Sequence, residues 1–182
     1  AMFSSPFAAL DSTNRRIALL QAKPDISADE QAEVVALQEF AASLSVIDAN
    51  SFSKFQCLVK HLKSTAFNWQ PSDSADRLVI FSERIETLRW LQESLPKAAG
   101  LKSTQLEILH GGMTDTEQQD LVDRFGRKDD PMRVLLCSDV ASEGLNLHYF
   151  CHRLVHFDLP WSLMVFQQRN GRVDRHGQTH PT

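Results

Sequence analysis

The segment QRNGRVDR, residues 168–175, combines residue types that can hold a polyanion. On a helix, Gln168, Gly171, Arg172 and Arg175 would share one face, because side chains three, four and seven positions apart lie above one another. Arginine presents a permanently charged, planar fork that matches phosphate oxygens, and the glycine would allow close approach. The segment predicts a phosphate-binding helix face, with a solvated basic surface as the competing interpretation.

A second polar cluster, CSDVASEGLNL, occupies residues 137–147 and follows an apolar run. It contains Ser138, Gly144 and Asn146 within a turn of small residues. Polar side chains gathered where a strand ends, beside a glycine, are typical of a ligand-binding loop. Taken alone the pattern is weak, since many helix N-termini read Ser-Asp.

The elements that would position these residues alternate between strands and helices. Short apolar runs lie at residues 77–82, 105–110, 133–138 and 153–158. Helical patterns separate them, and a last helix is expected from Ser162 to Asp174. Near-continuous apolar strands alternating with helices predict an α/β fold with a parallel sheet covered on both faces. In such a sheet, ligands gather at the carboxyl ends of the strands.

The N-terminal third has a different character. Residues 1–67 show helical periodicity without strand-like runs, and SADE at 27–30 and SKFQ at 53–56 each predict a capping box that starts a helix. The polar stretch NWQPSDSAD at 68–76 breaks the periodicity. We therefore expect a helical extension over 1–67, a linker over 68–76 and the sheet domain over 77–182.

In sequence order, these segments resemble the motifs of superfamily-two helicases and translocases. Residues 168–175 follow the family's sixth motif, Q-x-x-G-R-x-x-R, and residues 137–147 resemble its fifth. RLVIFSERIETLRWL resembles the fourth, and LEILHGGMTDTEQQDLVDRF the strand, loop and helix that follow it. HRLVHFDLPW and RVDRHGQ narrow the resemblance to the Swi/Snf-like branch, especially its bacterial RapA-like members. One departure is Glu143, which lies where remodellers carry a glycine-rich loop.

The resemblance implies a RecA-like second lobe, and it implies a role for each matching residue. Arg172 and Arg175 would be arginine fingers that reach the γ-phosphate of ATP, and Gln168 would orient the nucleotide. The ribose and phosphates would lie near Gly144, Asn146, Gly171 and Asp174. The nucleic-acid backbone would face Ser82, Arg84, His110, Gly111 and Ser138.

The chain lacks the other half of an ATP site. It contains no Gly-Lys dipeptide, so no G-x-x-x-x-G-K-[ST] loop is available, and its one Asp-Glu pair, Asp29-Glu30, begins a helix instead of ending a strand. We expect ATP with Mg²⁺ to be bound mainly by the N-terminal RecA-like lobe of the same parent chain. This piece alone would then be monomeric and inactive. The family favours double-stranded DNA as partner, with RNA left open. A non-catalytic interaction or regulatory module that keeps the fold is the alternative function.

Composition narrows the remaining classes. The formal charge of −4 excludes a global basic field, so any nucleic-acid contact must be local. Three cysteines without a C-x-x-C pair argue against a disulfide framework and for a reducing, cytoplasmic setting, and no apolar run is long enough to cross a membrane. Zinc binding is the weaker interpretation of the cluster at His148, Cys151, His152 and His156. Cys137 is expected to be a buried small hydrophobe, and Trp90 and Trp161 to be packing residues.

Overall fold

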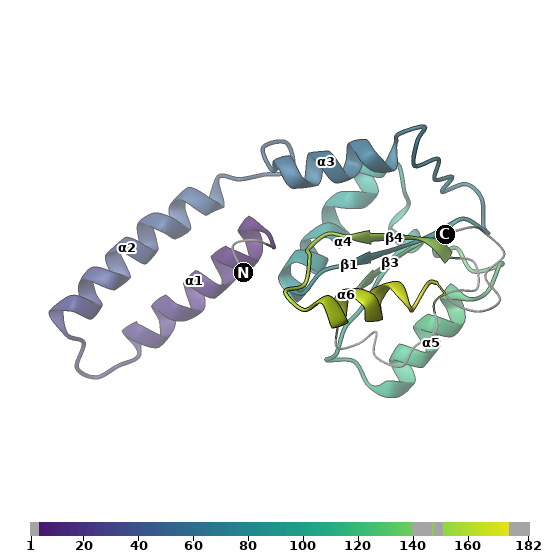
Figure 1. Cartoon of the computed structure of the whole chain (residues 1–182). Helices are drawn as coiled ribbons and strands as arrows, with labels where there is room; N and C mark the ends of the chain where they lie inside the picture. The colour runs from purple at the N-terminus through teal and green to yellow at the C-terminus, as the bar shows by residue number, and fades with distance from the viewer. Residues whose placement is uncertain (1–3, 140–146, 148–150, 175–182) are drawn as a thin grey trace.

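The computed structural model describes residues 4–139, 147 and 151–174 (Figure 1). Its helices are α1 (Pro6–Gln21), α2 (Ala28–Ser45), α3 (Ser53–Leu62), α4 (Ile85–Ala99), α5 (Asp115–Phe125) and α6 (Leu163–Asn170), with a short 3₁₀ turn at Ser103–Gln105. Its strands are β1 (Arg77–Phe81), β2 (Leu106–Leu109), β3 (Val134–Cys137) and β4 (Cys151–His156).

The strands form one parallel sheet in the order β2-β3-β1-β4. Phe81, the last residue of β1, pairs with Cys137 of β3 and with His156 of β4. The carboxyl ends of these three strands therefore meet at one edge of the sheet. This confirms the predicted α/β fold and its parallel sheet.

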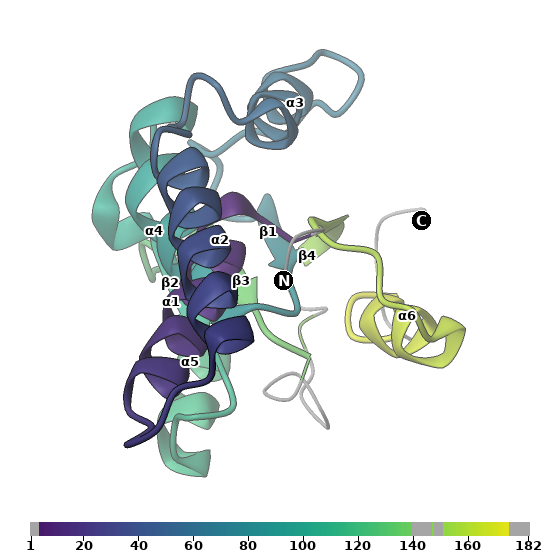
Figure 2. The ribbon, with the colours of Figure 1, turned by 90° about the vertical axis from the view of Figure 1, so that its left-hand side faces the viewer.

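Both faces of the sheet are covered, as the continuous apolar strands predict. Alternate residues of β1 point to opposite sides: Leu78 and Ile80 pack in one core cluster with α3 and α4, whereas Val79 and Phe81 pack in a second cluster with α5. Helix α6 lies on the side of the sheet away from α4 (Figure 2).

Helices α1 and α2 form a hairpin that projects from the sheet domain (Figure 1). The predicted capping box at the start of α2 is present, with Ser27 and Glu30 bonded reciprocally. Val34 is the buried residue of α2. The exposed ion pair Arg16–Glu33 joins α1 to α2, and Lys23–Glu30 joins the turn after α1 to α2. No helix within the described ranges is long and apolar enough to cross a membrane.

Helix α3 packs directly on the sheet domain, with Phe55, Leu58 and Leu62 in the same core cluster as β1. Its predicted capping box is wrong: Phe52 is the N-cap and makes no side-chain bond, because the helix already begins at Ser53. The polar segment after it is also packed, since Trp69 is buried and its indole nitrogen donates to the main-chain oxygen of Asp76. The domain boundaries at 67 and 76 stay predictions.

Arg77, at the start of β1, is a fully buried arginine on the edge opposite the strand ends. Its guanidinium donates to main-chain oxygens in the last turn of α5 and the turn after it, those of Arg124, Phe125, Arg127 and Asp130. Burial lowers the pKa of Arg77, but an arginine keeps its charge at neutral pH. The cation therefore lies against carbonyls that carry the negative end of the helix dipole.

Candidate functional site

The candidate site lies where β1, β3 and β4 end. Ser82 follows β1, Ser138 and Asp139 follow β3, and Asp158 follows β4 after one intervening residue. The described parts of the two segments that the sequence singles out, 137–147 and 168–175, contact each other. Arg169 pairs with Asp139 at this edge of the sheet, and Arg172 bonds to Leu147.

Arg169 ties these strand ends to α6. Its side chain is 1% exposed and makes a two-pronged ion pair with Asp139, in which Nη2 lies 2.8 Å from Oδ2 and Nε donates to Oδ1. Its Nη1 donates to the main-chain oxygen of Asp158 at 2.6 Å, and the guanidinium lies 5.4 Å from the centroid of the Phe81 ring. A buried arginine needs such complete pairing, so this geometry fixes α6 against three strands.

His156 completes the surroundings of Arg169. Burial lowers the pKa of His156, and the neighbouring Arg169 cation lowers it further, although the bond to Asn170 opposes the shift. The neutral ring then donates from Nε2 to Oδ1 of Asn170 at 2.9 Å. That tautomer leaves Nδ1 as an acceptor facing Nη1 of Arg169 at 3.4 Å.

Arg172 lies just beyond α6, not on it. The helix ends at Asn170, and turns held by main-chain bonds to Asn170 continue to Asp174, so the predicted helix end at Asp174 is wrong. The main-chain oxygen of Arg172 accepts from Leu147 at 3.0 Å. Val173 and Leu147 share one buried cluster. The turn after α6 therefore packs the segment 168–175 against Leu147, the last residue of the segment 137–147.

Gln168, Gly171 and Asp174 differ in exposure. Gln168 and Asp174 are exposed, whereas Gly171 is half-buried at the helix end. A Cβ added at Gly171 would lie 3.4 Å from the oxygen of Gln167, an ordinary contact. A Cβ would therefore fit at position 171 without a steric clash with the described part of the chain.

One buried polar atom in each of the two predicted motifs has no hydrogen-bond partner within the described part of the chain. The two atoms are Oγ of Ser138 and Nε of Arg172. Leaving a buried donor unsatisfied costs about 1–3 kcal/mol, so such groups commonly mark a ligand's position. A phosphate oxygen has the acceptor chemistry that both a guanidinium and a hydroxyl can satisfy.

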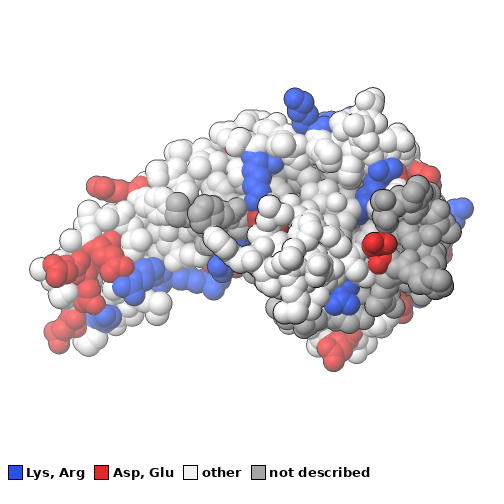
Figure 3. Space-filling view, viewed as in Figure 1, with Lys and Arg blue, Asp and Glu red and all other residues white. Residues whose placement is uncertain are grey.

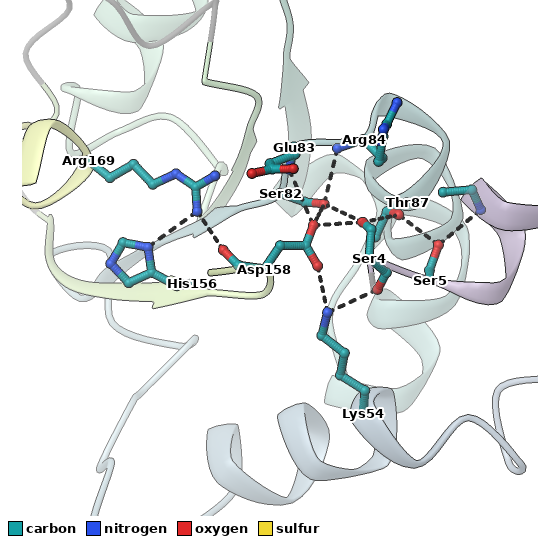
Figure 4. Close-up of polar contacts among 11 residues, drawn as sticks. Ser4, Ser5, Lys54, Ser82, Glu83, Arg84, Thr87, His156, Asp158 and Arg169 are labelled. Atoms are coloured by element: carbon teal, nitrogen blue, oxygen red, sulfur yellow. Dashed lines mark hydrogen bonds and ion pairs between the residues drawn. The ribbon is translucent and has the colours of Figure 1, made fainter. Parts of the chain in front are cut away.

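Asp158 is the centre of a second, buried polar network (Figure 4). Its carboxylate accepts from Lys54 Nζ at 2.5 Å, from Ser4 Oγ at 2.6 Å and from the Ser82 hydroxyl. Ser4 and Ser5 also bond to Thr87 at 2.8 and 2.7 Å. Burial would raise the pKa of Asp158, but the bonds from Lys54, Ser4 and Ser82 outweigh it and hold the pKa below its usual value. The carboxylate therefore stays charged at neutral pH.

The residues predicted to face nucleic acid lie in different environments. Ser82 is fully buried within the Asp158 network, whereas Arg84 is exposed and points away from that network in Figure 4. Gly111 is exposed in the turn after β2, and Nδ1 of His110 accepts from the Gly112 amide at 3.1 Å. A side chain at Gly112 would press on that ring, because its Cβ would lie 3.1 Å from Nδ1.

A cavity of about 610 Å³ opens beside the Asp158 network. Its lining residues are Ser4, Lys54, Glu83, Arg84, His156, Phe157, Asp158, Leu159 and Trp161. Trp161 is 93% exposed, and Leu159, Leu163 and Met164 near it are also exposed. The packing prediction is therefore wrong for Trp161. It is confirmed for Trp90, which stacks on Phe7 with ring centroids 4.2 Å apart.

Charge is distributed unevenly on the side of the molecule that Figure 3 shows. Basic side chains are scattered over the sheet domain, several adjoin one another along the α1–α2 hairpin, and acidic ones gather at the outer end of the hairpin.

Several sequence predictions fall elsewhere. Gly144, Asn146, Arg175 and His148 lie outside the described residues. Cys137 is buried and its environment raises the pKa of its thiol, which confirms it as a core residue and not a nucleophile. Within the described ranges, no three His, Cys, Asp or Glu side chains gather as metal ligands. The sequence analysis did not identify Lys54, Asp158 and Arg169 as site residues. The one feature that could have indicated them is a charged side chain next to an apolar run.

Comparisons with known proteins agree on the kind of domain. Residues 53–177 match the family described as helicase conserved C-terminal domain. The RNA polymerase-associated protein RapA of Vibrio vulnificus strain YJ016 is 30% identical over 131 residues, covering 72% of this chain and 13% of that protein. RapA of Vibrio campbellii is 34% identical over 104 residues, covering 57% of this chain and 10% of that protein. The chain thus spans about a tenth of the length of these relatives.

Two solved structures share the architecture. The C-terminal part of the Fun30 ATPase domain aligns with a TM-score of 0.60 over 98% of this chain and 60% of that chain, at 18% identity. This similarity supports the fold, including the helices that precede the sheet. Domain 2 of the DEAD-box helicase Mss116p, bound to an RNA duplex, aligns with a TM-score of 0.54 at 25% identity, covering 69% of this chain and 46% of that chain.

Proposed function

The chain belongs to the helicase conserved C-terminal domain family, and from this membership we propose that it is the second motor lobe of an ATP-dependent DNA translocase. In this proposal a first lobe carries the phosphate-binding loop and most of the Mg²⁺–ATP contacts. The lobe described here contributes Arg172 and Arg175 across the cleft. Closing and reopening of the two lobes during hydrolysis would drive movement along double-stranded DNA.

The observation that carries the proposal is the joining of two motifs that lie far apart in the sequence. Arg169 forks onto Asp139, and the Leu147 amide donates to the main-chain oxygen of Arg172. The Arg169 contacts fix α6 at the carboxyl edge of the sheet, where ligands bind in open parallel sheets. The Leu147 bond then fixes the turn after α6, which carries Arg172.

An unsatisfied polar atom supports a phosphate as the ligand. Nε of Arg172 is buried without a partner among the described residues. Arg172 would donate to the γ-phosphate as negative charge develops during its transfer, an effect worth about 10³–10⁵ in rate. Gln168, Gly171 and Asp174 would border the nucleotide, together with Gly144 and Asn146.

Nucleic acid would approach the neighbouring surface, where Arg84, His110 and Gly111 are accessible. Arg84 offers a guanidinium, and the turn at Gly111 offers main-chain groups for phosphate contacts. The nucleic-acid contacts of Ser82 and Ser138 stay predictions. The Ser82 hydroxyl is bonded to Asp158 and Ser4 in this structure.

Trp161 adds an apolar ring to this surface, and its removal is expected to weaken DNA binding. An exposed aromatic ring can lie in a duplex groove or stack on an unpaired base, with about 1–3 kcal/mol per base at stake. Trp161→Ala in the complete ATPase should therefore raise the Kd for DNA at least about fivefold, measured by fluorescence anisotropy at fixed salt. Trp161→Phe should retain most of the affinity. An unchanged Kd for the alanine variant would remove Trp161 from the interface.

The proposed function is tested by measuring ATP hydrolysis with the 182-residue chain alone and with the parent's first lobe fused to it, each with and without double-stranded DNA. We expect no turnover by the chain alone and DNA-stimulated turnover by the fusion. Turnover by the chain alone would contradict the proposal, because the chain would then have to contain a phosphate-binding site other than the missing G-x-x-x-x-G-K-[ST] loop. Absence of turnover in the folded fusion would instead favour the non-catalytic module.

A further inference from the structure

The Asp158 network joins parts of the chain that lie on opposite sides of the proposed ATP edge. Lys54 belongs to α3 and Ser4 to the segment before α1, whereas Arg169 belongs to α6. Lys54 and Ser4 bond to the carboxylate of Asp158, and Arg169 bonds to the main-chain oxygen of the same residue. Figure 4 shows Lys54 and Arg169 approaching Asp158 from different directions.

Each member of this connection is held firmly. Asp158 is 7% exposed, and Lys54 also donates to the main-chain oxygen of Ser4 at 2.9 Å while its ammonium lies 4.3 Å from the Phe157 ring centroid. Asp158 is buried and Lys54 is half-buried, and charged groups that make several hydrogen bonds in such surroundings have few alternative positions. A displacement of Asp158 must therefore move the carbonyl that Arg169 uses.

Arg169 in turn lies three residues before Arg172, and the Arg172 amide donates to its main-chain oxygen at 3.2 Å. The position of Arg172 thus depends on Arg169, which depends on Asp139 and on Asp158. Misplacing a catalytic group by about 1 Å can cost about 10²-fold in rate. A residue that fixes Asp158 can consequently influence hydrolysis without touching ATP.

We propose that Lys54 is a positioning residue for the ATPase, acting on Arg172 through Asp158 and Arg169. This connection makes the helices that precede the sheet part of the mechanism that places the arginine. The inference rests on the proposed function, because it assumes that Arg172 acts in hydrolysis.

The test compares Lys54→Met with Lys60→Met in the complete ATPase. Both lysines lie on α3, but Lys60 is exposed. At saturating DNA, Lys54→Met is expected to lower kcat about 10- to 100-fold with the KM for ATP nearly unchanged, whereas Lys60→Met should match the wild type. Lys54→Arg, which keeps a donor for Asp158, should recover much of the rate. Lys54→Met and Asp158→Asn should be non-additive when combined, because they interrupt the same connection.

Three outcomes would overturn the inference. Equal kcat values for Lys54→Met and Lys60→Met would show that hydrolysis does not depend on the bond from α3 to Asp158. A defect that vanishes at saturating DNA would place Lys54 in the DNA contact instead. Additive effects of Lys54→Met and Asp158→Asn on kcat would show that the two residues act independently. Arg172→Ala, measured in parallel, separates these results from failure of the proposed function, because an active Arg172→Ala enzyme would contradict the function itself.

Discussion

Replacing Arg172 by alanine in the complete two-lobed ATPase is expected to lower kcat about a thousandfold while the KM for ATP changes by less than about threefold. The reason is that a guanidinium aimed at the γ-phosphate stabilises charge that develops mainly in the transition state. The fold should survive, because the contact of Arg172 with Leu147 uses a main-chain oxygen. Steady-state hydrolysis over a range of ATP concentrations measures both constants.

Two companion variants make the Arg172 result specific. Arg172→Lys keeps a positive charge but loses the planar fork, so only partial activity should return. Arg127→Ala removes an exposed arginine beyond α5 and should leave kcat unchanged. If Arg172→Ala hydrolyses ATP at the wild-type rate, Arg172 is not a finger, and the basic segment reverts to a solvated surface.

Replacing Arg77 by methionine is expected to lower the free energy of unfolding of this chain by about 3–5 kcal/mol. Methionine fills much of the same space but leaves the main-chain oxygens of Arg124, Phe125, Arg127 and Asp130 without their shared donor. The carbonyls of Arg124 and Phe125 lie in the last turn of α5, where partial negative charge accumulates, and the other two lie in the turn after it. Urea denaturation followed by circular dichroism gives the difference.

The matched control for Arg77 is Arg127→Met, since the Arg127 side chain is exposed while its main-chain oxygen belongs to the same cluster of acceptors. A change within about 0.5 kcal/mol is expected for this control. An equally small change for Arg77→Met would mean that water replaces the guanidinium at little cost.

Much of the fold was predictable because its determinants are local. The strands were recognisable because β1 and β3 are buried on both faces and so consist of apolar runs. The capping box at Ser27 forms between residues three apart. The same motif fails at Ser53, where the helix begins one residue earlier than the pattern indicates.

The sequence predicted a location for the candidate site but not the contacts within it. Residue types marked the two motifs, but their spacing did not reveal that Arg169, not Arg172, is the arginine paired with Asp139. Arg169, Asp158 and Lys54 act through partners distant in sequence, which periodicity cannot detect. Trp161 was misassigned for a related reason: an apolar segment indicates burial, but nothing described packs over this one.

The bond between Ser4 and Asp158 has a consequence for biosynthesis. These residues are separated by 154 positions, and Lys54 and Asp158 by 104. When the ribosome has produced the α1–α2 hairpin, β1 and α4, the strand β4 that precedes Asp158 does not yet exist. The contacts of the N-terminal segment with α4, such as the stacking of Phe7 on Trp90, can form earlier, because α4 precedes β4 in the chain. The bonds of Ser4 and Lys54 to Asp158 can form only after Asp158 has been synthesised, so they are among the last contacts of the domain to be made.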